Sequence, residues 1–179
     1  MQRLAVDVFI SGGGVAGLAA AAAFGSAGYS VICVDPAPPV VTGDAPSADL
    51  RTTAFLQPSI PVLAAAGLWA RLEAQAMPLQ VMRIVDAGGA NPEARITHDF
   101  DAADVSAQPF GWNLPNWLLR REFVARLAEL PNVDFRPGVS TGRLVTRERE
   151  ALVTLSDGSR IAARLVACPD RGRGSLRGA

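Results

Sequence analysis

The sequence predicts an α/β fold that opens with a strand, a glycine-rich turn, a helix and a second strand. Three observations predict it. Residues 8–34 carry no charged side chain, which indicates a buried stretch. The segment Gly12-Gly13-Gly14-Val15-Ala16-Gly17 has the spacing G-x-G-x-x-G, and Asp35 directly follows the last apolar run. This order of signals is typical of two parallel strands joined by a crossover helix.

Each element of this unit has its own local signal. Residues 6–11 are β-branched and aromatic, which predicts the first strand. Residues 18–24 are rich in alanine and predict a helix, and residues 31–34 predict the second strand. Because a glycine turn separates the first strand from the helix, the unit is Rossmann-like.

The glycines and the acid predict a dinucleotide site. Gly12 allows a tight turn, Gly14 lets the backbone approach a pyrophosphate, and Gly17 lets the helix pack closely. The phosphates would lie at the helix N-terminus, and Asp35 would accept hydrogen bonds from the ribose hydroxyls. The motif alone also fits a glycine-rich turn in an ordinary domain. Strand, helix, strand and acid in register favour the dinucleotide.

The apolar stretch 8–34 also resembles a membrane span or a signal peptide. The glycines from Gly12 to Gly28 disfavour a spanning helix, and Asp7 interrupts the run that a signal peptide would need. We therefore expect a soluble, cytoplasmic protein.

Composition excludes several function classes. The chain has 179 residues, 49% of them hydrophobic, and zero formal net charge, so it can bury a core but has no basic surplus for nucleic acid. Cys33 and Cys168 lie in apolar runs and are expected to be buried, reduced thiols. His98 is the only histidine, so a histidine-rich metal site is not expected. Residues 99–104 contain three aspartates but lack the ligand spacing of a calcium loop, so we expect a solvated acidic loop there. Because the sequence has no Cys/His cluster, any redox chemistry must come from a bound cofactor, and no side chain is assigned a catalytic role.

The rest of the chain predicts further helices and strands. A proline-rich loop after Asp35 leads to two short helical segments, and a later helix stops at Pro131. Asp157-Gly158 predicts a hairpin turn. The predicted helical segments are 60–67, 68–76 and 117–130, and the predicted strands are 79–85, 94–100, 133–135, 144–145, 151–155 and 161–167.

Several motifs recur in the order found in one family. They are Asp7-Val8, the glycine turn, Arg51-Thr52-Thr53-Ala54, Leu63, Gly67-Leu68-Trp69, Arg120 with Phe123 and Leu127, Asp157-Gly158, and residues 165–177. By these motifs the whole chain resembles the FAD-dependent aromatic-ring hydroxylases, and most of all the branch that hydroxylates ubiquinone precursors.

The resemblance assigns roles to individual residues. Gly12, Gly14, Gly17 and Asp35 would hold the ADP half of FAD. Arg51 would lie near the pyrophosphate and flavin, and Arg120 would contact the cofactor from its helix. For both arginines a solvated surface charge is the alternative, and Arg121 is the alternative to Arg120.

The resemblance also implies a domain division and a missing part. Residues 1–78 and 114–179 would form an incomplete FAD-binding domain, and residues 79–113 part of a mostly antiparallel substrate sheet. Family members are about twice as long and carry a second Gly-Asp flavin motif. An extra arginine, Arg171, stands between Asp170 and Gly172, where the family has the acid next to the glycine. We therefore expect a truncated chain.

The implied chemistry belongs to the cofactor. NAD(P)H would reduce FAD, and the reduced flavin would use O2 to hydroxylate a small aromatic or prenylated phenol. The resemblance is compatible with association at the periphery of the inner membrane or with a biosynthetic complex. Two alternatives stay open: a non-enzymatic remnant that binds at most adenine nucleotide, and another flavoprotein, such as a halogenase or an isoprenoid reductase. The chain alone is expected to be inactive.

Overall fold

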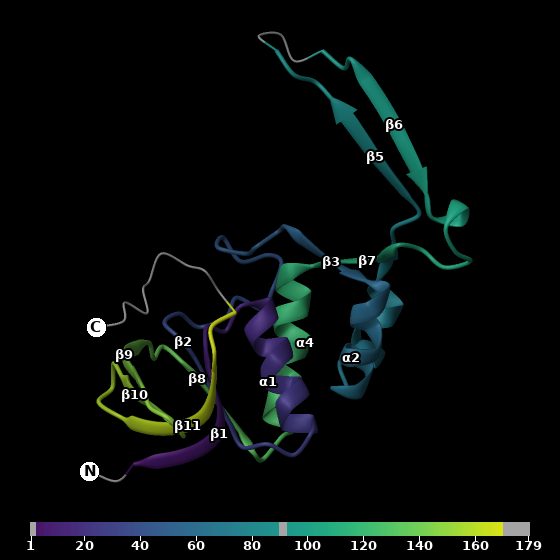
Figure 1. The fold of residues 1–179 in the computed structure, drawn as a ribbon. Helices are drawn as coiled ribbons and strands as arrows, with labels where there is room; N and C mark the ends of the chain where they lie inside the picture. The colour runs from purple at the N-terminus through teal and green to yellow at the C-terminus, as the bar shows by residue number, and fades with distance from the viewer. Residues whose placement is uncertain (1–2, 90–92, 170–179) are drawn as a thin grey trace.

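The computed structural model describes residues 3–89 and 93–169, and its main body is one sheet of six strands covered by two long helices (Figure 1). The strand order is β8-β2-β1-β11-β10-β9. The strands are β1 (Leu4–Ser11), β2 (Val31–Asp35), β8 (Val133–Pro137), β9 (Thr141–Thr146), β10 (Ala151–Leu155) and β11 (Arg160–Ala167), and the helices are α1 (Val15–Ser26) and α4 (Asn116–Ala128).

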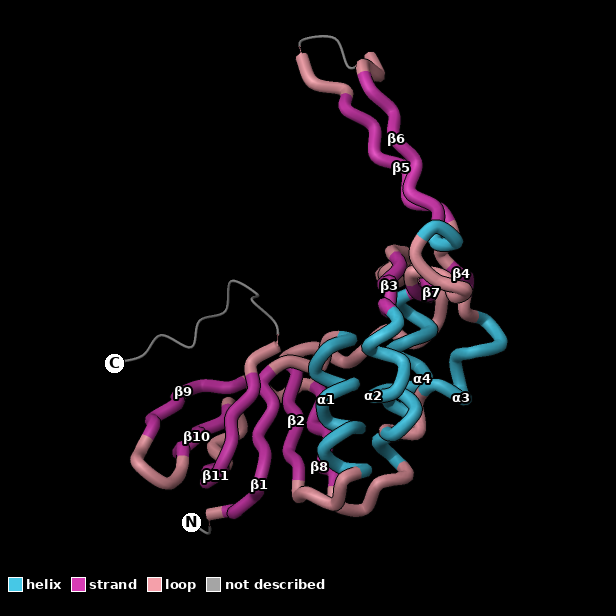
Figure 2. The backbone as a smooth tube through the Cα atoms, turned by 45° about the vertical axis from the view of Figure 1, so that its right-hand side comes forward, coloured by secondary structure: helices cyan, strands magenta, loops and turns pink. Residues whose placement is uncertain are grey.

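The predicted βαβ unit is confirmed. β1 and β2 are parallel neighbours, and Val8 lies opposite Val31 in the register. β8 joins β2 and β11 joins β1, both in parallel, whereas β9, β10 and β11 pair antiparallel. Figure 2 shows the helices on one side of this sheet and the β9–β11 strands curling away at its other end.

Two apolar clusters hold the sheet in place. On the helix face, Ile10, Leu18 and Phe123 are fully buried between β1, α1 and α4. On the opposite face, Phe9 and Ile161 lie in a second buried cluster that joins β1 and β2 to β10 and β11. Because both faces of β1 and β2 are covered, both strands read as continuous apolar runs in the sequence.

A smaller sheet lies beyond one end of α4. It contains β3 (Thr52–Leu56), β7 (Gly111–Pro115) and β4 (Met77–Pro78) in the order β3-β7-β4, all antiparallel. Between β3 and β4 the chain forms α2 (Ile60–Ala65) and α3 (Trp69–Leu72), separated by Gly67 with φ +73°. β7 runs directly into α4, so this sheet fixes where α4 begins.

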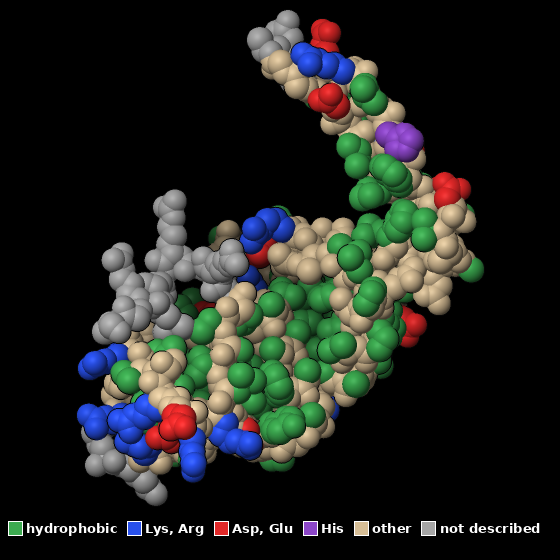
Figure 3. Space-filling model, in the orientation of Figure 1, with side chains coloured by type: hydrophobic (Ala, Val, Ile, Leu, Met, Phe, Trp, Pro, Cys, Tyr) green, Lys and Arg blue, Asp and Glu red, His purple; other side chains and the backbone are tan. Residues whose placement is uncertain are grey.

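A two-stranded hairpin projects from the body (Figure 1). Its strands, β5 (Val81–Asp86) and β6 (Ile96–Asp101), match the two strands predicted for this region. The prediction of a solvated acidic loop over residues 99–104 is partly wrong. β6 continues to Asp101, and Asp99 accepts a hydrogen bond from Arg83 at 2.7 Å. Figure 3 shows hydrophobic side chains along the projecting hairpin, where every described residue of both strands is exposed.

The remaining predictions concern the two cysteines, the C-terminal motif, the domain division and a membrane span. Cys33 is buried as predicted, but Cys168 is exposed, because β11 ends at Ala167 and the chain leaves the sheet there. Asp170 and Arg171 lie outside the described residues, and the division into domains stays a prediction. Among the described residues, no helix is long and apolar enough to cross a membrane.

Candidate cofactor site

The glycine turn connects β1 to α1 and has little room for side chains. Gly12 has φ +118°, a conformation that favours glycine, and its N–H donates to the carbonyl of Val34 at 2.8 Å. A Cβ placed on Gly17 would overlap the carbonyl oxygen of Gly12. The first turn of α1 therefore packs directly on the backbone of the glycine turn, in agreement with the roles predicted for Gly12 and Gly17.

Asp35 is tied to this turn. One carboxylate oxygen accepts a hydrogen bond from the Gly13 N–H at 2.7 Å, and the other accepts one from the Ala37 N–H at 2.9 Å. A Cβ on Gly13 would lie 2.9 Å from the Asp35 Cβ, so Gly13 is also constrained, which sequence reasoning missed. Each carboxylate oxygen can accept a second hydrogen bond. The ribose contact of Asp35 stays a prediction.

A pocket of about 230 Å³ opens beside the turn. It brings together Gly14, Gly17, Arg51 and Arg120, four of the six predicted site residues. The complete lining is Gly14, Val15, Ala16, Gly17, Asp49, Arg51, Thr53, Asn116, Arg120 and Pro169. Gly12, in the turn, and Asp35, at the end of β2, adjoin the pocket without lining it.

The neighbouring Arg121, the alternative to Arg120, does not line this pocket. Its guanidinium lies over the ring of Trp117, 5.4 Å from the centroid, and its Nε donates to Glu122 at 2.9 Å. The geometry therefore favours Arg120 as the arginine of this helix that reaches the pocket.

Asp49 was not predicted as a site residue, yet it contacts both pocket arginines. Arg51 donates from Nε and Nη2 to the two carboxylate oxygens at 2.8 and 2.9 Å, and the Arg120 Nη2 lies 3.6 Å away. Asn116 donates from Nδ2 at 3.0 Å. The hydrogen bonds from Arg51, and then that from Asn116, hold the pKa of Asp49 far below its usual range. The available signal was its position two residues before Arg51.

Asn116 connects three segments at the start of α4. Its side chain is buried, its Oδ1 accepts a hydrogen bond from Thr53 at 2.6 Å, and its backbone N–H donates to the carbonyl of Arg51 at 2.9 Å. The pairing of β3 with β7 sets this geometry, because Thr53 lies opposite Leu114 in the register. Nothing in the local sequence marks Asn116, since its partners are far away along the chain.

The arrangement suits a bound anion. Two permanently charged guanidinium groups outnumber the single carboxylate of Asp49, and the N-terminus of α1 adds free N–H groups beside Gly14. A phosphate or pyrophosphate has the charge and the acceptor oxygens that such a pocket binds.

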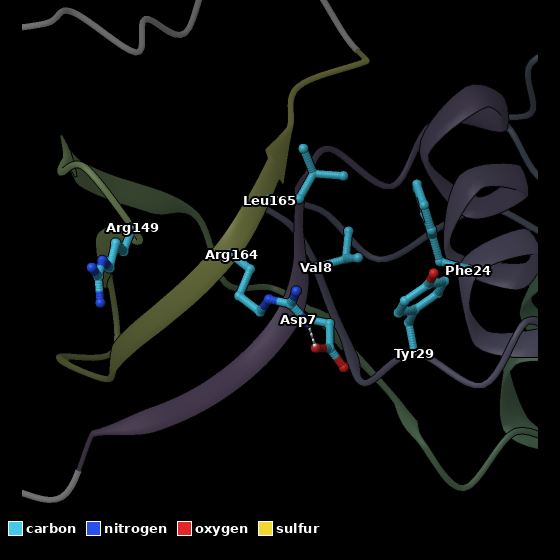
Figure 4. Close-up of a pocket in the computed structure, with 7 residues that line it drawn as sticks. All are labelled: Asp7, Val8, Phe24, Tyr29, Arg149, Arg164 and Leu165. Atoms are coloured by element: carbon cyan, nitrogen blue, oxygen red, sulfur yellow. Dashed lines mark hydrogen bonds and ion pairs between the residues drawn. The ribbon is translucent and has the colours of Figure 1, made fainter.

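A larger pocket, of about 450 Å³, lies elsewhere beside α1 (Figure 4). Val8 and Leu165 come from the sheet, Phe24 and Tyr29 from the end of α1 and the loop after it, and Arg164 donates to Asp7 at 3.0 Å. Hydrogen bonds from Ser30 lower the pKa of Asp7. No residue of the glycine turn lines this pocket.

Comparison with known proteins agrees with the geometry. The chain is 32% identical over 181 residues to the ubiquinone hydroxylase UbiL of Rhodospirillum rubrum, covering 96% of this chain and 38% of that protein. It is 26% identical to the ubiquinone hydroxylase UbiM of Neisseria meningitidis, covering 92% of this chain and 35% of that one. The chain thus spans little more than a third of the curated relatives it matches.

Solved structures share the fold. The p-nitrophenol 4-monooxygenase PnpA of Pseudomonas putida superposes with a TM-score of 0.73 at 23% identity, covering 99% of this chain and 44% of that one. The flavin-dependent monooxygenase PieE, solved with FAD and substrate, gives 0.66 at 24% identity, covering 93% and 30%. The sequence model of the FAD binding domain matches residues 5–177, nearly the whole chain. The chain therefore belongs to the FAD binding domain family.

Proposed function

We propose that this chain is the cofactor-binding part of an FAD-dependent monooxygenase. The proposed reaction is hydroxylation of a phenolic ring, with a ubiquinone precursor as substrate and with NAD(P)H and O2 as co-substrates. The observation that carries the proposal is the pocket in which the glycine turn meets Arg51 and Arg120. Family membership supports FAD, and the names of the two curated relatives support the substrate class.

The residues present fit the pyrophosphate and ribose of FAD. Gly14 lines the pocket and has no side chain to block the approach of a pyrophosphate, and the two arginines that line it supply the opposite charge. Asp35 would hold the ribose through the free acceptor positions on its carboxylate. When bound, FAD supplies the electron transfer and the oxygen activation, while these residues bind and orient it.

A second candidate function is binding of adenine nucleotide without catalysis. The observation that favours it is the pocket itself, whose glycine turn and two arginines would accept the phosphates of an adenine nucleotide without any residue assigned to catalysis. The two proposals agree on the pocket and differ on turnover.

Turnover is tested by extending the chain with the C-terminal remainder of UbiL. We expect this fusion, supplied with FAD, NAD(P)H and a phenol, to consume O2 and release a hydroxylated product. The same fusion with Gly14→Val is the matched control and should lose flavin and turnover together. The isolated chain should show no turnover.

Two results would contradict this account. A fusion that retains FAD but oxidises no NAD(P)H with any phenol tested would leave only the nucleotide-binding function. Turnover by the isolated chain would show that no further polypeptide is needed.

A further inference from the structure

One carboxylate contacts both arginines of the pocket. Asp49 binds Arg51 through two hydrogen bonds, of 2.8 and 2.9 Å, and lies 3.6 Å from Arg120. The two arginines come from distant parts of the chain: Arg51 lies just before β3, and Arg120 lies in α4. Asp49 is therefore the side chain that bridges the two arginines.

The two hydrogen bonds leave Arg51 competent to bind an anion. A guanidinium has five N–H donors, and Asp49 accepts from Nε and Nη2, so three donors remain. The Arg51 side chain is 82% exposed, so little else in the described residues restrains it. Without Asp49 it would sample many rotamers and lose part of its binding strength to conformational entropy.

Asp49 is itself held firmly. Its side chain is 13% exposed, and it accepts a hydrogen bond from the buried Asn116 at 3.0 Å. Asn116 in turn accepts from Thr53 and donates to the backbone of Arg51. Contacts with the start of α4, which is itself tied to β3, thus hold Asp49 in place, and Asp49 in turn contacts the two arginines.

We propose that Asp49 is a positioning residue for pyrophosphate binding, which fixes Arg51 and Arg120 in the orientation that meets the phosphates at the glycine turn. This inference rests on the proposed function of the same pocket. In the opposite role Asp49 would be an internal competitor: its carboxylate would occupy N–H donors of the arginines, and its negative charge would repel phosphate. The two roles differ in sign, because removing a competitor would tighten binding.

The experiment compares the 179-residue chain with its Asp49→Asn variant, using ADP and FAD as probes. We expect the dissociation constants to rise about tenfold, which corresponds to one charge-assisted hydrogen bond. Asp44→Asn is the matched control, since Asp44 is an exposed acid of the same loop outside the pocket lining, and it should change neither constant. Circular dichroism and a thermal melt establish that each variant is folded.

A double-mutant cycle separates positioning from a general structural role. In an Arg51→Gln background, Asp49→Asn should weaken binding less, because one of the two side chains that it orients, and the one it hydrogen-bonds, is gone. Equal weakening in both backgrounds, or unchanged or tighter binding by Asp49→Asn, would overturn the inference while the proposed function stands. Failure of the unchanged chain to bind either probe would overturn the proposed function and the inference with it.

Discussion

At the scale of single residues, the two cysteines show how position in the sheet decides chemistry. Cys33 lies within β2 and is fully buried, and this burial, with a smaller contribution from the charge of Asp35, raises its pKa to about 12. Cys168 follows the last residue of β11 and is exposed, although partial burial still raises its pKa. Both lie in apolar runs, so the sequence could not distinguish them.

This difference leads to a prediction about thiol reactivity. Because its pKa is raised, the Cys33 thiol stays protonated as the pH rises through 8 and 9, and its burial blocks reagents. Iodoacetamide at pH 8 should therefore modify Cys168 first, and Cys33 only after unfolding in denaturant, as followed by mass spectrometry. A Cys168→Ser variant should show no fast labelling. Rapid modification of Cys33 in the folded chain would contradict the burial described for β2.

At the scale of elements, the contact between α1 and the glycine turn depends on the missing Cβ of Gly17. In Gly17→Ala the new methyl group would meet the Gly12 carbonyl, so α1 must shift on the sheet. We expect a loss of about 2 kcal/mol or more in the free energy of unfolding, measured by urea denaturation. Ala16→Gly, one position earlier in the helix, should cost only about 1 kcal/mol. A stable Gly17→Ala chain would show that α1 does not pack as described.

The elements that could be predicted from the sequence are those whose signals are local. The βαβ unit, α4 and the hairpin at Asp157-Gly158 each have their pattern within one short segment, and the structure contains all three. The contact between Asp49 and Asn116 joins residues 67 positions apart, and it depends on the register of β3 against β7. Neither residue's own surroundings in the sequence carry information on that register, so the network was missed.

At the scale of the whole molecule, the β5–β6 hairpin presents an apolar face with no partner in the described residues. Met82, Ile84, Ile96 and Phe100 lie on one face by strand alternation, and all are exposed, by 41% to 66%. An isolated two-stranded hairpin is marginally stable, and its edges and apolar face favour association. We therefore expect the isolated chain to self-associate.

Substitutions on the two faces of the hairpin test this expectation. Met82→Thr with Ile84→Thr should reduce binding of a hydrophobic dye and shift sedimentation towards the monomer. Val81→Thr with Val85→Thr, on the opposite face, should do so less, since that face already carries the Arg83–Asp99 ion pair. Equal effects from both pairs would show that the apolar face has no special role.

The most direct test of the central claim is a titration of the chain with FAD, followed by flavin fluorescence, beside its Gly14→Val variant. Gly14 lines the pocket with Arg51 and Arg120, and a branched side chain there would occupy the place of the pyrophosphate. We expect saturable binding by the unchanged chain, weaker binding by Asp35→Ala, and none by Gly14→Val, with all three equally folded by circular dichroism. Equal flavin binding by the unchanged chain and Gly14→Val would contradict the proposed site.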